Sequence, residues 1–323
     1  MGKVMKSLHV QIKGLGLKSP LMTASGTSGH GNGTAVLKNS PNIISSLGAF
    51  VTKGVTLEPR HGNPEPRIVE TRAGIINSIG LQNNGVEVFV KEELPDFLNV
   101  DLPIIVNIAA NTVEEFGKLA SYLSDNDLSQ IIKGIEINVS CPNIKKGGIA
   151  FGVDPRQVER IVKTVKRNID SRMIVITKLT PNITDITLPA RAAIEGGSDA
   201  LSMINTLRAM AVDIDREKPY LGNKTGGLSG PAIKPVGIFM VYECFEKIPE
   251  CNSGKIPIIG IGGISTWQDA IEYIMAGATA VGIGTAWFVN QDVFHGIYNG
   301  IKLYVKNNNK SISDLIGKAH KEE

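Results

Sequence analysis

Several features are scarce in this chain of 323 residues, and each scarcity excludes a class of protein. Its three cysteines, at positions 141, 244 and 251, form no CxxC pair and no set of four. A disulfide framework, or an iron–sulfur cluster held by this chain alone, is therefore excluded. No apolar run approaches the roughly 18–20 residues that cross a bilayer. The net charge is only +3 without a basic tract, so neither a nucleic acid nor a membrane is expected as a partner. We expect a cytoplasmic enzyme.

Short apolar runs alternate with amphipathic segments along the whole chain. The runs predict strands at 21–24, 50–53, 104–108, 135–139, 174–179, 200–204, 256–261 and 280–283. Helical patterns between them cover 113–123, 155–167, 187–195, 235–245 and 266–275. Eight strands that are mostly apolar on both faces and alternate with helices favour a closed parallel (β/α)8 barrel, a TIM barrel of the α/β class. A doubly wound open sheet is the alternative. Without a repeat or linker, we expect residues 1–323 to form one domain.

Two segments are longer than a minimal barrel requires. Residues 56–84 are rich in Gly, Pro and Arg, and residues 205–230 are polar and end in glycines. Long ordered loops on the C-terminal face of a barrel are usually lids or ligand-binding loops. We therefore expect both insertions to lie beside the active site.

The strand predicted at 135–139 ends in a group of reactive and polar side chains. Pro142 lacks an N–H and ends the strand, which places Cys141 at its C-terminal edge. Active sites of α/β proteins are built at this edge, and a thiol there can accept a proton. A free cysteine is nevertheless more often buried and inert, so Cys141 alone does not decide the function.

Glycines, lysines and amides at the other strand ends indicate the kind of ligand. Glycine-rich turns follow the last two predicted strands, at 260–263 and 282–284, where barrels commonly bind phosphate. A tight entry into the next helix is the structural alternative for these glycines. Lys53, Lys178, Asn107, Asn138 and Asn205 end five further strands. A buried lysine needs an anionic partner or a shifted pKa, and buried amides need hydrogen bonds. A planar, heteroatom-rich group with a phosphate fits this set, as FMN does.

At this point the sequence resembles the dihydroorotate dehydrogenases over nearly its whole length. The resemblance rests on ordered motifs at 24–27, 52–54, 77–83, 138–143, 178–182, 204–206, 227–231 and 260–264. The family fold is an FMN-binding (β/α)8 barrel, and the family reaction oxidises dihydroorotate to orotate in pyrimidine synthesis. Cys141 is similar to the base of class 1 enzymes, because class 2 enzymes use serine. Motifs at 57–64 and 147–152 are similar to class 1B, whereas the class 1A homodimer that uses fumarate is the alternative.

The resemblance implies specific roles for the site residues. Cys141 would remove the C5 proton of dihydroorotate while the C6 hydride moves to FMN N5. Substrate would be held by Lys53, Asn77, Ser78, Ile79, Gly80, Leu81, Asn138, Asn205 and Thr206. FMN would be held by Ser25, Lys53, Gly54, Asn107, Asn138, Lys178, Ile204, Gly230, Gly262, Gly263, Gly284 and Thr285. No metal is implied.

Class 1B also implies a partner protein. Electrons would pass to NAD⁺ through a second subunit that carries FAD and a [2Fe–2S] cluster, with a homodimer of this chain inside a heterotetramer. Two unrelated functions remain as rivals: a lyase or aldolase that uses Lys178 as a Schiff-base amine, and a catalytically silent scaffold. Dihydropyrimidine dehydrogenase has a related barrel, but it carries many cluster cysteines, which this chain lacks.

Overall fold

A closed parallel barrel forms the centre of the molecule. The computed structural model describes residues 8–29, 41–127, 129–140, 142–143 and 149–321. Within them, eight parallel strands are hydrogen-bonded in the order β3-β18-β17-β12-β11-β8-β7-β4. A parallel bridge between Met22 and Ala49 joins the two ends of this order. The strands are β3 (Leu21–Thr23), β4 (Phe50–Val51), β7 (Ile104–Ile108), β8 (Ile132–Asn138), β11 (Ile174–Lys178), β12 (Ala200–Met203), β17 (Ile258–Ile261) and β18 (Ala280–Ile283). The predicted barrel is confirmed, and the open-sheet alternative is wrong.

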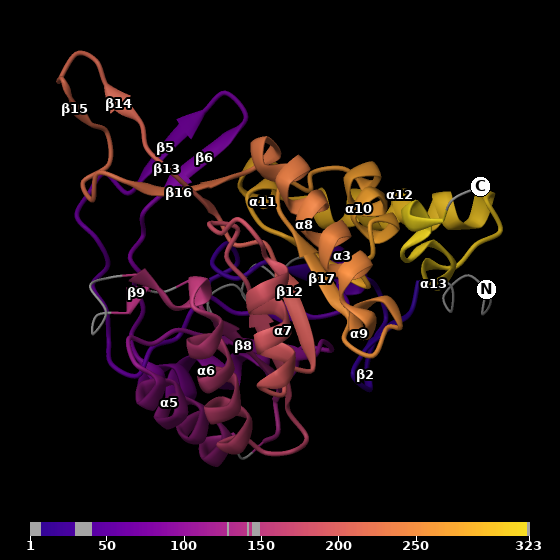
Figure 1. Ribbon diagram of the computed structural model, residues 1–323, viewed down its shortest axis with the longest axis horizontal. Helices are drawn as coiled ribbons and strands as arrows, with labels where there is room; N and C mark the ends of the chain where they lie inside the picture. Colours follow the sequence, from indigo (N-terminus) through magenta and orange to yellow (C-terminus); the bar gives the residue numbers. More distant parts are fainter. Residues whose placement is uncertain (1–7, 30–40, 128, 141, 144–148, 322–323) are drawn as a thin grey trace.

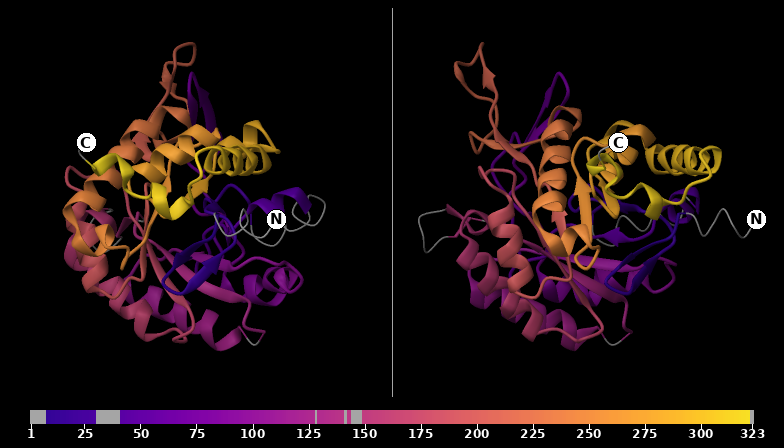
Figure 2. Two further views of the ribbon diagram at one scale, coloured as in Figure 1. Left: turned by 90° about the vertical axis from the view of Figure 1, so that its right-hand side faces the viewer. Right: turned by 45° about the vertical axis from the view of Figure 1, so that its right-hand side comes forward.

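Helices surround the barrel (Figures 1 and 2). The long ones are α5 (Val113–Asn126), α6 (Pro155–Arg167), α7 (Thr187–Glu195), α8 (Lys234–Lys247), α10 (Trp267–Met275) and α12 (Val293–Asn307). Shorter helical segments are α3 (Pro41–Ser46), α4 (Val86–Val88), η1 (Phe89–Glu93), η2 (Leu94–Phe97), η4 (Phe151–Val153), η5 (Pro231–Ile233), α9 (Pro249–Asn252), α11 (Ala286–Val289), α13 (Ile312–Leu315) and η6 (Lys318–His320). None of the helices described here is long and apolar enough to cross a membrane.

Local signals explain where these helices begin. Thr112 accepts a hydrogen bond from the Glu115 backbone N–H at 3.1 Å and caps α5. Thr266 caps α10 in the same way, and the Asp269 side chain completes a capping box. Capping groups satisfy N–H groups that otherwise lack a partner in the first helical turn. The predicted helix start at residue 113 is therefore confirmed, whereas α10 begins at Trp267, one residue after the predicted start.

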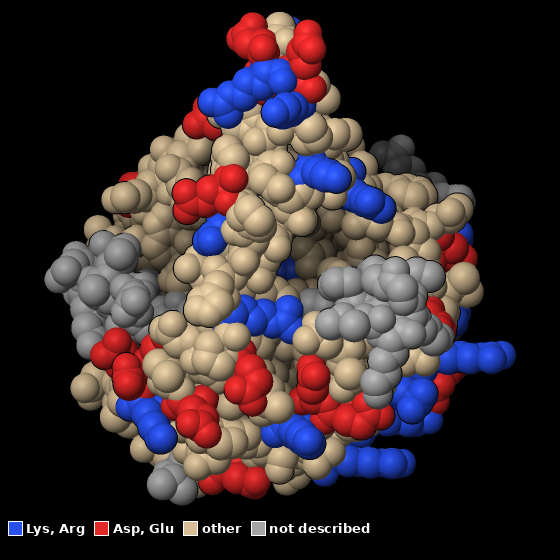
Figure 3. All heavy atoms as spheres, turned by 90° about the vertical axis from the view of Figure 1, so that its left-hand side faces the viewer, with Lys and Arg blue, Asp and Glu red and all other residues tan. Residues whose placement is uncertain are grey.

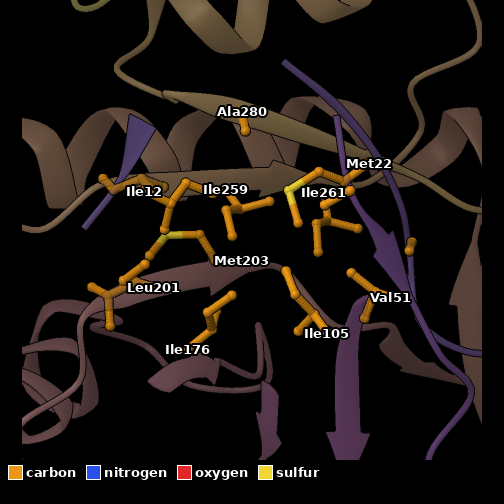
Figure 4. Close-up of a cluster of buried hydrophobic side chains, with 14 of the residues drawn as sticks. Ile12, Met22, Val51, Ile105, Ile176, Leu201, Met203, Ile259, Ile261 and Ala280 are labelled. Carbon is orange, nitrogen blue, oxygen red and sulfur yellow. The ribbon is translucent and has the colours of Figure 1, made fainter. Parts of the chain in front are cut away.

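The barrel interior changes from apolar to polar along several strands. Met22, Val51, Ile105, Ile176 and Ile259 are buried and point toward one another in the middle of the barrel (Figure 4). Side chains two positions apart lie on the same face of a strand. The next inward-facing positions after Val51, Ile105 and Ile176 are therefore Lys53, Asn107 and Lys178. This alternation places the predicted cations and amides at the C-terminal mouth.

The amino-terminal end of the barrel is covered by a hairpin. Strands β1 (Val10–Ile12) and β2 (Leu15–Leu17) pair antiparallel, and the Ile12 and Leu17 side chains are fully buried. Ile12 points toward the interior cluster in Figure 4. The functional cavity is consequently confined to the opposite end.

The two long insertions form one antiparallel sheet over the mouth. Its strand order is β13-β16-β6-β5, from β5 (Ile68–Thr71), β6 (Gly74–Asn77), β13 (Leu207–Ala209) and β16 (Gly226–Ser229). A hairpin of β14 (Val212–Asp213) and β15 (Lys218–Pro219) projects beyond it (Figure 1). Strands β9 (Pro142–Asn143) and β10 (Ile149–Ala150) form a further short pair. We call the four-stranded unit the mouth sheet.

Candidate active site

A single large cavity lies at the mouth of the barrel, between the carboxyl ends of the strands and the mouth sheet. Its volume is about 1970 Å³. Pockets for one drug-sized ligand usually measure about 300–1,000 Å³, so this cavity has room for a large cofactor and a small substrate together. Figure 3 shows a hollow in the middle of this face, with Lys and Arg side chains at its edge.

The cavity collects nearly all of the predicted site residues. Its lining includes Ser25, Lys53, Gly54, Asn77, Ser78, Ile79, Gly80, Leu81, Asn107, Asn138, Lys178, Ile204, Asn205, Thr206, Gly230, Gly262, Gly263, Gly284 and Thr285. Cys141 and residues 147–148 lie outside the described residues. The predicted positions thus share one cavity, while the role of each remains a prediction.

A group of amides lies at the carboxyl end of β8, in the residues that directly precede Cys141 in the sequence. The Asn205 side-chain N–H group donates to Ser140 Oγ at 3.0 Å and to Asn138 Oδ1 at 3.3 Å. Asn138 Oδ1 also accepts from the Ser140 backbone N–H at 3.1 Å. On its other side, Asn205 Oδ1 accepts from the Thr206 backbone N–H at 2.8 Å. These bonds join the loop after β8 to the loop after β12, and they fix the direction in which each amide faces.

A second polar network shapes the loop after β6. Ser78 Oγ accepts hydrogen bonds from Asn63 Nδ2 at 2.9 Å and from Asn223 Nδ2 at 3.1 Å. Asn77 Nδ2 donates to the Gly227 carbonyl at 3.3 Å, across the mouth sheet. Both insertions therefore contribute to one rigid wall. The sequence prediction missed Asn223, because its partner Ser78 is 145 positions away.

Lys53 lies half-buried at the mouth among other charged groups. Burial is the main cause that lowers its pKa below the ordinary value, the Glu93 charge opposes this shift, and the Arg67 charge adds to it. Burial likewise raises the pKa of Glu93, against a hydrogen bond from Asn84 and the Lys53 charge. Lys53 therefore combines a lowered pKa with an anionic neighbour, the two features that the sequence led us to look for in a lysine at this position.

Lys178 lies deeper and has a different anion beside it. Its Nζ lies 3.9 Å from Glu136 Oε1, and both side chains are buried. The same Oε1 accepts a 2.6 Å hydrogen bond from Asn107 Nδ2, and Glu136 Oε2 accepts a 2.8 Å bond from Ser202 Oγ. Glu136 was given no role from the sequence. The sequence did contain a signal for such a role: Glu136 is an acidic residue inside an apolar run, two positions before Asn138 and therefore on the same strand face.

The glycine-rich strand ends provide free backbone donors. Gly262 and Gly263 have φ angles of 133° and 69°, which side chains rarely allow. Among the described residues, no acceptor is bound by the backbone N–H groups of Gly262, Gly263, Gly284 and Thr285. Asp269 Oδ2 already accepts from the N–H groups of Ser265 and Thr266, at 3.0 and 2.8 Å. A phosphate would therefore be bound by the two glycine turns and not by the α10 N-terminus.

These observations define a (β/α)8-barrel protein whose mouth carries lysines, side-chain amides and glycine-rich turns around one large cavity. The family model "Dihydroorotate dehydrogenase" matches residues 7–304. The chain belongs to the dihydroorotate dehydrogenase family, and it is thus an oxidoreductase. The family predicted from the sequence motifs is confirmed.

Individual relatives match nearly end to end. The chain is 49% identical over 312 residues to a protein of Caldicellulosiruptor bescii, covering 96% of this chain and 98% of that one. It is 46% identical over 311 residues to a protein of Geobacter sp. strain M21, covering 96% and 97%. Both relatives are named "Dihydroorotate dehydrogenase B (NAD(+)), catalytic subunit". These names agree with class 1B, the class predicted from the sequence, and they do not favour the class 1A alternative that uses fumarate.

Proposed function

We propose that this chain is the catalytic subunit of a two-subunit dihydroorotate dehydrogenase that produces orotate for pyrimidine synthesis. The observation that carries the proposal is the cavity lining. Two lysines, Lys53 and Lys178, and three amides, Asn107, Asn138 and Asn205, meet there beside free backbone N–H groups. Lysines attract a carboxylate, and amides both donate to and accept from a heterocycle that carries carbonyl and N–H groups. Dihydroorotate has all of these groups.

The residues present fit FMN as the cofactor. The free N–H groups of the glycine turns suit its phosphate, and a side chain at Gly263 would come within 2.8 Å of the Gly230 carbonyl oxygen. A side chain therefore does not fit at position 263. When bound, FMN supplies the acceptor for the hydride that leaves dihydroorotate. Ser25, Gly54, Ile204 and Gly284 complete the proposed cofactor set.

The chain itself supplies the base and the groups that orient the substrate. Cys141 is the proposed base for the C5 proton. A free thiol has a pKa of about 8.5, so its reactive fraction grows as the pH rises through neutrality. Asn205 and Asn138, which hold the adjoining Ser140, are proposed to bind the substrate ring, while Lys53 attracts its carboxylate. The loop from Asn77 to Leu81 would cover the remaining side of the ring, and Thr206 its edge.

The electrons then require a partner. The relatives are named as catalytic subunits of NAD(+)-linked enzymes, which supports a partner subunit for this chain too. We propose that the partner carries FAD and a [2Fe–2S] cluster, since three scattered cysteines cannot hold such a cluster here. The assembly would contain a homodimer of this chain, each copy acting as one domain, in the cytoplasm.

Turnover with different electron acceptors tests this proposal. The chain should be purified alone and together with the proposed partner subunit that carries FAD and a [2Fe–2S] cluster, and supplied with dihydroorotate. We expect NAD⁺ reduction only in the presence of the partner, and no turnover with fumarate. Fumarate reduction by the isolated chain would contradict the two-subunit assignment. Absence of bound flavin, or no oxidation of dihydroorotate with any acceptor including a dye, would contradict the proposed function itself.

A further inference from the structure

Glu136 is the least expected residue of the barrel mouth. It lies on β8, and its carboxylate contacts side chains from three other strands: Asn107 on the neighbouring β7, Lys178 on the neighbouring β11, and Ser202 on β12, one strand further along the barrel. Its side chain is 3% exposed. Asn107 and Lys178 line the cavity, whereas Glu136 and Ser202 do not. The carboxylate therefore lies one layer beneath the floor of the cavity.

Electrostatics gives this position a consequence for any ligand above it. A buried charge is costly unless an opposite charge lies close to it. At 3.9 Å, Glu136 balances the Lys178 charge without a hydrogen bond, and no described residue accepts a hydrogen bond from Lys178 Nζ. The ammonium donors are thus left for a ligand, while the pair has no net charge. Removing either partner would expose the ligand to one uncompensated charge in a low-dielectric site.

Asn107 is oriented by the same carboxylate. A carboxylate only accepts hydrogen bonds, so the Asn107 NH₂ group must face Glu136, with a separation of 2.6 Å. Asn107 Oδ1 then faces the cavity side, 3.1 Å from the place that a Cβ on Gly54 would take. Glu136 consequently determines that the floor offers one acceptor, from Asn107, beside the Lys178 donors.

We infer that Glu136 is a positioning residue that sets the reduction potential of the cofactor through Lys178. The inference rests on the proposed function, because it takes FMN as the group above the floor. Reduction adds negative charge to a flavin, and nearby cations favour it whereas anions oppose it. With the pair intact, the Glu136 charge offsets that of Lys178 and holds the potential below the value that the lysine alone would give.

Three variants separate this role from a purely structural one. The potential of bound FMN should be measured by anaerobic dye equilibration at two pH values. A mildly acidic pH keeps Lys178 protonated in Glu136→Gln, and a mildly alkaline pH keeps Glu136 ionised in Lys178→Met. We expect Glu136→Gln to shift the potential upward, Lys178→Met to shift it downward, and the double variant to return near the wild-type value. Gln keeps an oxygen that can accept from Asn107, so Glu136→Gln removes the charge with little change in shape. Asp127→Asn is the control, because Asp127 is a buried acid that binds N–H groups at the opposite end of β8.

Other outcomes would overturn the inference. A structural role predicts that Glu136→Gln leaves the potential unchanged or lowers it, and that the double variant is no better than Lys178→Met alone. If Glu136→Gln fails to fold, the comparison between Lys178→Met and the double variant decides between the two roles. The double variant is expected to fold, because removal of both partners of a buried charge pair is tolerated. At the alkaline pH, Glu136→Gln in the Lys178→Met background should raise the potential, and no change there would refute the inference.

The flavin-free protein gives an independent measurement of the charge pair. In melting experiments we expect Glu136→Gln to lower the melting temperature in the wild-type background and to raise it in the Lys178→Met background. This reversal would hold even if FMN were not the cofactor. If the chain shows this reversal but binds no flavin, the proposed function is refuted. If Glu136→Gln lowers the melting temperature equally in both backgrounds, the pairing of Glu136 with Lys178 is refuted.

Discussion

Asn205 and Ser140 are joined across the barrel mouth by a 3.0 Å hydrogen bond from Nδ2 to Oγ. Asn205 follows β12 and Ser140 follows β8, so the bond connects two loops of the active-site face. Ser140 directly precedes Cys141 in the sequence, and Asn205 begins the insertion that forms half of the mouth sheet. The amide of Asn205 therefore connects the residue that precedes the proposed base to the insertion that contributes to the mouth sheet.

Replacing Asn205 tests this connection. Asn205→Ala removes the bonds to Ser140 and Asn138. The variant would also lose the proposed hydrogen bond to the substrate ring. Because loss of a buried hydrogen bond costs about 1–3 kcal/mol, we expect orotate to bind about tenfold more weakly or worse. Asn126→Ala is a suitable control, since that exposed amide bonds only to the Tyr122 carbonyl on α5. Titration calorimetry with orotate measures both variants, and equal affinities would contradict a substrate-binding role for Asn205.

Charges around Lys53 predict the pH dependence of orotate binding. Protonated Lys53 attracts the orotate carboxylate, so affinity should fall as the pH rises through the pKa of Lys53, which burial has lowered. Glu93 raises this pKa and Arg67 lowers it. We therefore expect Glu93→Gln to move the loss of affinity to lower pH and Arg67→Gln to move it to higher pH. Shifts in the same direction for both variants would indicate general loosening of the site instead.

A pair of glycines tests the proposed phosphate site. Gly263 and Gly254 have similar φ angles, 69° and 74°. A Cβ on Gly263 would come within 2.8 Å of Gly230 O and of Lys234 Cβ, whereas a Cβ on Gly254 meets nothing within 4 Å. Both alanine variants share a backbone strain of about 1 kcal/mol, but we expect only Gly263→Ala to lose FMN. Flavin content after gel filtration measures this, and normal content in Gly263→Ala would remove the glycine turn from the site.

Limited proteolysis tests whether the second insertion acts as a lid. Arg208 lies on β13 and lines the cavity, while Arg216 lies in the projecting hairpin outside it. Trypsin can cleave after either residue. We expect orotate to slow cleavage after Arg208 and to leave cleavage after Arg216 unchanged, which provides an internal control. Equal rates with and without orotate at Arg208 would count against a lid.

The sequence predicted the parts of the site that depend on single strands. Lys53, Asn107 and Lys178 each follow an apolar inward position by two residues, so strand alternation was sufficient to place them at the mouth. The bounds of β7 and β18 were also predicted correctly, whereas β8 begins at Ile132, three residues earlier than expected. There the polar Lys133 faces outward and hides the start of the strand.

Features that depend on distant segments were not predictable in this way. Glu136 acquires its role from partners on three other strands, one of them 66 positions away. The mouth sheet pairs Asn77 with Gly227, and no local pattern specifies a pairing across so long a separation. Both insertions line the cavity at the barrel mouth, where the sequence led us to expect them, but their union into one sheet followed only from the structure.

The most direct test of the whole account is the anaerobic reaction of the purified chain with dihydroorotate, followed by the visible absorbance of bound flavin. We expect rapid loss of the oxidised flavin band without any partner protein. Cys141→Ala should bind the same amount of flavin but lose its colour far more slowly. A wild-type chain that holds flavin and keeps its colour with dihydroorotate would contradict the central claim, as would reduction at an unchanged rate in Cys141→Ala.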